Sequence, residues 1–182
     1  MAIEVVTVFG SSAVPEDHPD YGEARRLGSL LAKEGFIVAN GGYGGVMAAV
    51  SRGAKEAGGK TIGVTSAIFS ERSGANPWID REIRTKSLQE RLEKTIDVGD
   101  AHIAMPGGPG TFAEIGLTWN LLQRRLLPKD GPLILMGEMW DDLFRLYEKS
   151  PWVRRKDMDI LHRVLDVEEA VRIVVDANRR NR

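Results

Sequence analysis

Residues 101–127 have the sequence AHIAMPGGPGTFAEIGLTWNLLQRRLL. Their pattern predicts an apolar strand over 101–108, a glycine-rich turn, and a long helix over 111–127. A strand this apolar is typical of a parallel sheet, because helices cover both faces of such a sheet. The stretch therefore predicts an α/β fold in which a glycine-rich loop joins a central strand to a helix.

The alternation of strand and helix continues along the rest of the chain. Further buried strands are expected at 4–10, 36–42, 60–67 and 131–137. Helices are expected at 21–35, 45–59, 88–99, 139–150 and 166–182. Residues 161–166 could form a short edge strand or a connection. Because no linker or repeat interrupts the pattern, we expect residues 1–182 to form a single Rossmann-like domain, with a doubly wound parallel sheet in a three-layer α/β/α arrangement.

Composition and charge argue against several classes of protein. The 25 Lys and Arg residues nearly balance the 26 Asp and Glu residues, so no global charge favours nucleic acid or membrane as a partner. The absence of cysteine excludes a disulfide framework, a thiol nucleophile and a Cys-ligated metal site. The three histidines are scattered, and no metal site is expected. No apolar run approaches about 20 residues and no leader pattern opens the chain, so we expect a cytoplasmic protein.

Three chemically unusual loops follow predicted strands. Ligands of open parallel sheets bind beyond the carboxyl ends of the strands, so these loops are candidates for a ligand site. The loops are Gly10-Ser11-Ser12, residues 40–45 (NGGYGG) and residues 106–111 (PGGPGT).

The loop at 106–111 has the composition of a phosphate site. Gly107, Gly108 and Gly110 allow an anion to approach the backbone closely. Thr111 adds a hydroxyl at the start of the predicted helix, where unpaired N–H groups and the helix dipole favour phosphate. Glu114 lies one helical turn further on, so its carboxylate could face the same crevice. Alternatively, Glu114 could form a capping box with Thr111.

The other candidates have ordinary alternatives. The glycines at 41, 42 and 45 could contact a ligand or could only bring helix and sheet together. Ser11 and Ser12 could bind phosphate or ribose, or could cap a turn. Arg91, taken alone, is more typical of a solvated surface charge. The loop at 40–45 lacks the G-x-G-x-x-G pattern, and no acidic residue ends the second strand, which disfavours NAD.

Residues 106–114 (PGGPGTFAE) resemble the signature P-G-G-x-G-T-x-x-E of the Lonely Guy (LOG) family, the cytokinin riboside 5′-monophosphate phosphoribohydrolases. The resemblance extends from the loop at Gly10 to about Met136. It implies catalytic roles for Glu114 and for Arg91, which falls where the family carries its functional arginine. It implies that the substrate phosphate is bound by Gly107, Gly108, Gly110 and Thr111. Weaker substrate contacts are implied for Ser11, Ser12, Gly41, Gly42, Gly45 and Met47.

The resemblance also implies an activity. We expect hydrolysis of the N-glycosidic bond of an AMP-like nucleotide, with an adenine or cytokinin-type base, to free base and ribose 5-phosphate, without a cofactor or metal. We expect one nucleotide-binding domain that assembles as a homodimer or a larger homo-oligomer, with Trp119 and Leu122 as interface candidates. Lysine decarboxylation, a label often given to this family, is disfavoured because no lysine lies in the glycine loops to hold pyridoxal phosphate.

Departures from the family pattern leave the identity of the base open. In the glycine turn, Asn40, Val46 and Ala48 replace a glycine, a leucine and a glycine, and Pro109 occupies the variable position of the signature. A different class of function also stays open, because the Rossmann-like proteins related to this family include a molybdenum-cofactor carrier: the chain could be a nucleotide-binding sensor or a carrier of that type, without turnover.

Overall fold

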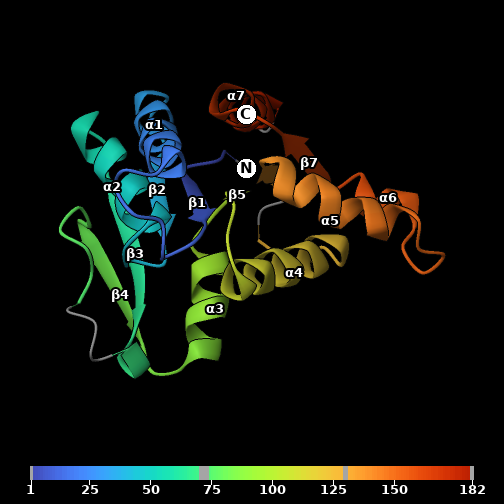
Figure 1. Cartoon of the computed structure of the whole chain (residues 1–182), viewed down its shortest axis with the longest axis horizontal. Helices are drawn as coiled ribbons and strands as arrows, with labels where there is room; N and C mark the ends of the chain where they lie inside the picture. Colours follow the sequence, from blue (N-terminus) through green and yellow to red (C-terminus); the bar gives the residue numbers. More distant parts are fainter. Residues whose placement is uncertain (1, 70–73, 129–130, 181–182) are drawn as a thin grey trace.

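A computed structural model describes residues 2–69, 74–128 and 131–180. In this part of the chain seven strands, all parallel, form one sheet in the order β4-β3-β2-β1-β5-β6-β7 (Figure 1). The strands are β1 (Val5–Phe9), β2 (Ile37–Asn40), β3 (Thr61–Ser66), β4 (Arg81–Thr85), β5 (Ala101–Ala104), β6 (Leu133–Met136) and β7 (Leu161–Val164). The predicted doubly wound α/β fold is confirmed, and residues 161–164 form the edge strand that was one of two expectations.

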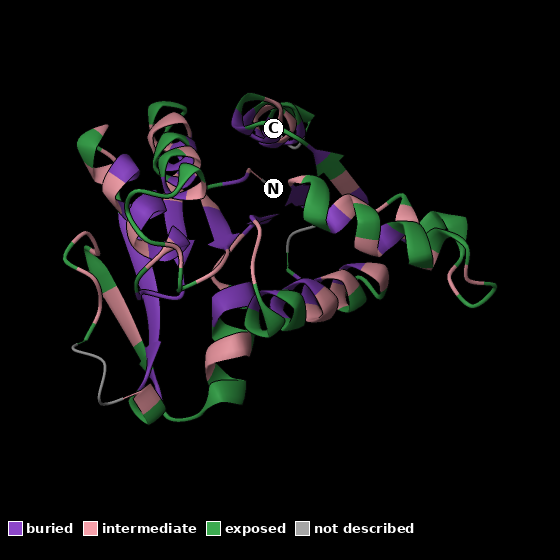
Figure 2. Cartoon of the chain, in the orientation of Figure 1, coloured by how far each residue is buried: buried purple, intermediate pink, exposed green. Residues whose placement is uncertain are grey.

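Helices cover both faces of the sheet. They are α1 (Pro19–Lys33), α2 (Val46–Glu56), α3 (Leu88–Asp97), α4 (Pro109–Gln123), α5 (Glu138–Glu148), α6 (Arg155–Met158) and α7 (Val167–Arg180), with the 3₁₀ turn η1 at Ala67–Phe69. One apolar core joins α1, α2 and α7 to the sheet, and a second core joins α3, α4 and α5 to it. Figure 2 shows the central strands buried between these two layers.

Three elements of the described chain were not predicted: the edge strand β4, the short helix α6 and the 3₁₀ turn η1. The sequence of β4, REIRT, has charged residues at three of its five positions and lacks an apolar run. Charged side chains are common on edge strands, where they discourage pairing with another chain. An edge strand of this kind carries a weak sequence signal.

The strands that follow β1 in the sequence lie first on one side of it in the sheet and then on the other side. From β1 the chain builds β2, β3 and β4 on one side, and then crosses to place β5 on the other side of β1. Phe9 at the end of β1 is aligned with Ala104 at the end of β5. The loops that follow these two strands therefore diverge at a topological switch point, where ligands of such sheets bind.

The helix α4 begins two residues earlier than predicted, at Pro109, with Gly108 as its N-cap. Proline is favoured at the first helical position, because its missing N–H would have no intrahelical partner there. The carbonyl of Gly108 accepts the first intrahelical bond, from the N–H of Phe112 at 3.0 Å. Thr111 is consequently inside the first turn.

Within β5, His102 is buried in the second core and stacks on Phe9, with 5.7 Å between the ring centroids. Its Nε2 lies 2.9 Å from the carbonyl oxygen of Ile96. Burial lowers the pKa of His102 to about 4, so the ring is neutral at neutral pH.

Across the described residues, none of the helices combines the length and the apolar character needed to cross a membrane.

Candidate active site

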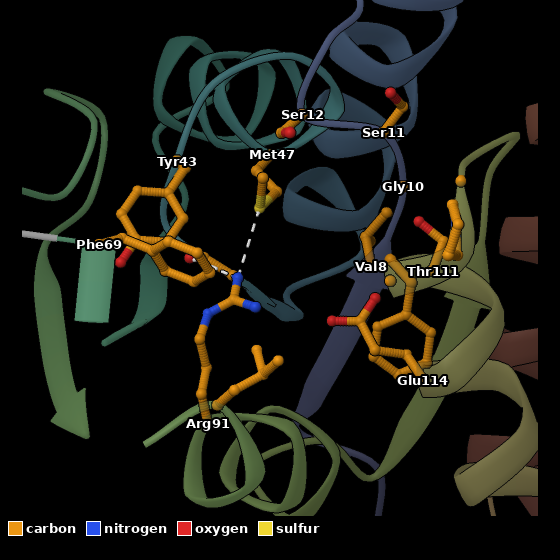
Figure 3. Close-up of a pocket in the computed structure, with 16 residues that line it drawn as sticks. Val8, Gly10, Ser11, Ser12, Tyr43, Met47, Phe69, Arg91, Thr111 and Glu114 are labelled. Atoms are coloured by element: carbon orange, nitrogen blue, oxygen red, sulfur yellow. Dashed lines mark hydrogen bonds between the residues drawn. The ribbon is translucent and has the colours of Figure 1, made fainter. Parts of the chain in front are cut away.

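A cavity of about 380 Å³ opens at the carboxyl ends of β1 and β5, between the start of α4 and the side chain of Arg91 (Figure 3). Nine of the twelve residues predicted for the site line it. These are Ser11, Ser12, Gly41, Met47, Arg91, Gly108, Gly110, Thr111 and Glu114. Segments as far apart in sequence as 10–12 and 108–114 thus meet at the switch point of the sheet.

The other three predicted residues, Gly42, Gly45 and Gly107, are not among the lining residues. Gly45 has a left-handed φ of 61° and is the N-cap of α2, where a Cβ atom would collide with the backbone carbonyl of Ser11. A Cβ atom on Gly107 would collide with the side chain of Thr111. These glycines permit close packing of the loops, which was the alternative interpretation for the glycine turn.

The start of α4 provides the groups expected of an anion site. The N–H groups of Gly110 and Thr111 precede the first intrahelical hydrogen bond and so have no partner within the helix. No side chain caps this end of the helix. The Thr111 side chain is buried at the cavity. Backbone donors and the positive end of the helix dipole are therefore available to a phosphate group.

Glu114 lines the same cavity from the next turn of α4 and is only 9% exposed. The capping box with Thr111 is wrong, because the N-cap of the helix is Gly108. Burial raises the pKa of Glu114 to about 7, and the positive charge of Arg91 offsets this effect in part. Desolvation of the carboxyl thus outweighs its attraction to Arg91. At neutral pH, Glu114 exchanges readily between its two protonation states.

Arg91 is half-buried and packed among other parts of the site, so its interpretation as a solvated surface charge is wrong. Its Nε donates to the carbonyl oxygen of Val64 at 3.0 Å and its Nη2 to that of Gly41 at 3.0 Å. A Cβ atom at Gly41 would push the guanidinium out of its present position, so glycine here lets Arg91 approach the backbone closely. Figure 3 shows the guanidinium and the carboxylate of Glu114 turned toward one another across the cavity.

The serine loop caps a turn and lines the cavity. Ser11 Oγ accepts a hydrogen bond from the N–H of Ala13 at 3.1 Å, which is the turn-capping role. The carbonyl of Ser11 accepts from the N–H of Val46 at 2.9 Å, which joins the loop to the start of α2. Ser11 and Ser12 also line the cavity, so both remain available to a ligand.

Sequence reasoning missed the part of the site formed by Asn40, Tyr43 and Phe69. Asn40 is fully buried; its Oδ1 accepts from the N–H of Gly42 at 2.8 Å, and its Nδ2 donates to Ser51 Oγ at 2.7 Å. Asn40, which replaces a glycine of the family pattern, thus stabilises the glycine turn through buried hydrogen bonds. Tyr43 and Phe69 line the cavity opposite Glu114. An aromatic residue within a glycine turn is a signal from which Tyr43 could have been predicted as a site residue. The sequence around Phe69 contains no such signal.

Fold and site together define a Rossmann-like α/β protein with an uncapped helix start and a buried carboxylate at the switch point of its sheet. The chain belongs to the SLOG cluster4 family, whose family model matches residues 4–130, and the expected relation to LOG proteins is confirmed. The cytokinin riboside 5′-monophosphate phosphoribohydrolase of Mycobacterium marinum is 34% identical over 116 residues, which are 63% of this chain and 62% of that enzyme. The chain thus spans less than two thirds of that relative.

Solved structures with a similar fold match almost the whole chain. The molybdenum cofactor carrier protein from Chlamydomonas reinhardtii superposes with a TM-score of 0.72 at 27% identity, covering 96% of this chain and 97% of that one. The molybdenum cofactor binding protein from Rippkaea orientalis superposes with a TM-score of 0.74 at 26% identity, covering 97% and 98% of the two chains.

Proposed function

We propose that this protein hydrolyses the N-glycosidic bond of a purine nucleoside 5′-monophosphate, releasing the free base and ribose 5-phosphate. One observation carries the proposal. A single cavity joins an uncapped helix start, which suits the phosphate, to the buried carboxylate of Glu114 and the cation of Arg91. The curated name of the mycobacterial relative supports the same reaction class.

In this proposal the phosphate is bound by the backbone N–H groups of Gly110 and Thr111 and by the Thr111 hydroxyl. Binding the phosphate at a distance from the reacting bond places the ribose carbon C1′ against Glu114. Cleavage of the bond between C1′ and the base nitrogen leaves positive charge on the ribose, as in other glycoside hydrolyses. The ionised carboxylate of Glu114 stabilises this charge.

Water completes the reaction. Its oxygen forms the new bond to C1′, one of its protons ends on the released base, and the electron pair of the broken bond leaves with the base nitrogen. Glu114 accepts a proton from the attacking water and passes it on, and a pKa of about 7 suits both steps at neutral pH. Arg91 orients the nucleotide and favours the ionised form of Glu114.

The test is incubation of the purified protein with AMP and with isopentenyladenosine monophosphate, followed by chromatography of the free base. We expect release of base by the native protein, and a loss of at least about 100-fold in Glu114→Gln, because general acid–base groups contribute at this scale. Glu93→Gln, an exposed substitution of the same chemistry on α3, is the matched control and should keep its activity. Absence of base release from both nucleotides by the native protein would overturn the proposal.

A second candidate is a nucleotide-binding sensor or a carrier of the molybdenum cofactor. It is favoured by the solved structures, because the molybdenum cofactor carrier of Chlamydomonas reinhardtii and the molybdenum cofactor binding protein of Rippkaea orientalis superpose on 96% and 97% of this chain. A carrier needs the anion site at the start of α4 but not the pair of Glu114 and Arg91. Calorimetry separates the two functions: AMP that binds without release of base supports the carrier or sensor.

We further propose that the protein is a homodimer that associates through the exposed face of α4. Phe112 is 38% exposed on this helix, and Gly116 and Leu117 are partly exposed. Apolar surface of this kind commonly marks a protein interface.

A further inference from the structure

The aromatic ring of Tyr43 lies against the guanidinium of Arg91. The central carbon of the guanidinium is 5.3 Å from the centroid of the Tyr43 ring, and 6.0 Å from that of Phe69. The two rings meet edge to face, with 5.6 Å between centroids and 83° between planes. A cation over an aromatic face at this distance is attracted by the ring quadrupole, and the attraction is larger where water is excluded.

Tyr43 is itself held at both ends. Its hydroxyl accepts from the N–H of Ser66 at 2.9 Å and donates to the carbonyl oxygen of the same residue at 3.3 Å. Its own carbonyl accepts from Nδ2 of Asn76 at 3.0 Å. The residue is only 6% exposed. The ring therefore forms a fixed platform between the end of β3 and the cavity.

The ring complements the other contacts of Arg91. The carbonyls of Val64 and Gly41 accept from Nε and Nη2 of the guanidinium, and Met47 Sδ lies 3.9 Å from Nη2, whereas the Tyr43 ring packs against the central carbon. The hydrogen bonds fix the distances from two guanidinium nitrogens to their acceptors. A ring held against the central carbon further restricts the movement of the group.

We propose that Tyr43 is a positioning residue, whose ring, anchored through its hydroxyl to the backbone of Ser66, holds the guanidinium of Arg91 in place opposite Glu114. The inference rests on the proposed function, in which Arg91 and Glu114 act on the nucleotide. Tyr43 acts through Arg91 and does not itself contact the reacting atoms.

The pKa of Glu114 depends on the position of Arg91. Among the described residues that line the cavity, Arg91 from α3 and Glu114 from α4 are the charged side chains, and Tyr43 is the other titratable one. Burial raises the pKa of Glu114 and Arg91 lowers it. Removal of the ring lets the guanidinium move, which weakens its mean attraction to the carboxylate. The pKa of Glu114 then rises further.

The test compares Tyr43→Leu, which removes the ring, with Tyr43→Phe, which keeps the ring and loses only the hydroxyl anchor. Tyr147→Leu is the matched control, since it removes a partly buried ring that packs against Trp119 and Phe144, outside the cavity. The kinetic readouts are kcat, KM and the pH profile with AMP. A readout independent of turnover is the titration of the Glu114 carboxyl carbon by NMR, assigned with Glu114→Gln.

For Tyr43→Leu we expect kcat at pH 7 to fall by about 10-fold, the size of a typical partly desolvated cation–π contact. The rising limb of the pH profile and the NMR titration of Glu114 should both move to higher pH. Tyr43→Phe should stay within about 3-fold of the native kcat, because the ring still faces Arg91. Tyr147→Leu should keep the native kcat and the native titration.

An unchanged Glu114 titration in a folded Tyr43→Leu protein would overturn the inference, whatever the activity. A rise in KM alone, with native kcat and native titration, would also overturn it, because Tyr43 would then be a ligand contact. Failure of the proposed function is distinguishable: the native protein would release no base, whereas the NMR titration would still measure the effect of Tyr43 on Glu114.

Discussion

Glu114 makes the stability of the folded protein depend on pH. Burial raises the pKa of its carboxyl from 4.5 in an exposed setting to about 7, so the folded state binds this proton more tightly than the unfolded chain does. The stabilisation from this proton is fully present below pH 4.5 and is lost as pH rises through about 7. The whole effect corresponds to about 3 kcal/mol of the free energy of unfolding.

Glu114→Gln replaces the carboxyl with a neutral group of similar size, so the cost of burying a charge disappears. We expect the variant to gain stability relative to the native protein as pH rises, with a gain about 2 kcal/mol larger at pH 8 than at pH 5. Urea unfolding at both pH values measures it, with Glu93→Gln as the exposed control. An equal difference at pH 5 and pH 8 would contradict the assignment.

At the scale of an element, the end of α4 contains a local strain. Arg125 follows the helix with a left-handed φ of 55°, and it is the non-glycine residue of the described chain with a positive φ. Its N–H donates to the carbonyl of Leu122 at 3.0 Å, and the N–H of Leu126 donates to that of Leu121 at 2.9 Å. This pattern is a Schellman motif, whose left-handed position favours glycine.

Arg125→Gly should therefore raise the free energy of unfolding by about 1 kcal/mol, because glycine adopts the left-handed region without a Cβ clash. Arg124→Gly is the matched control. Arg124 has a right-handed φ of −94°, so glycine there should lower stability by about 0.5–1 kcal/mol. Thermal or urea unfolding of both variants gives the comparison, and a loss of stability in Arg125→Gly would show that the arginine side chain outweighs the strain.

At the scale of the whole molecule, the proposed homodimer depends on which residues of α4 are exposed. Leu122, one of the two interface candidates, is wrong for that role because it is buried in the second core. Trp119 is partly used within the chain, since its Nε1 donates to the carbonyl of Asp157 at 2.6 Å. Phe112 is an exposed large hydrophobic residue on this helix, beside Thr111 of the cavity.

We expect light scattering to give twice the 20.1 kDa mass of the chain for the native protein. Phe112→Glu should shift the mass toward the monomer, because a charge cannot be buried at an apolar interface without a partner. Leu146→Glu, at an exposed position on α5, is the control and should leave the mass unchanged. A native mass of 20.1 kDa would contradict the proposed dimer.

Six of the seven strands and six of the seven α-helices in the described residues, the parallel sheet and the loop at 106–111 could be predicted from the sequence by itself, with residues 161–166 left as a strand or a connection. These features depend on contiguous residues: apolar runs, helical spacing, and glycines at strand ends. The resemblance at PGGPGTFAE likewise pointed to Glu114 and the start of α4 before any contact was known. The charged strand β4 could not be predicted, because its position at the edge of the sheet does not require an apolar run.

Only the tertiary structure decided how the site is held and how it is charged. Arg91 is half-buried because its guanidinium meets the carbonyl of Gly41, just after β2, the carbonyl of Val64 within β3, and the ring of Tyr43. The raised pKa of Glu114 likewise depends on how much water the surrounding loops exclude. Solvent exclusion and contacts between distant segments arise only when the sheet assembles, so no local pattern of residues contains them.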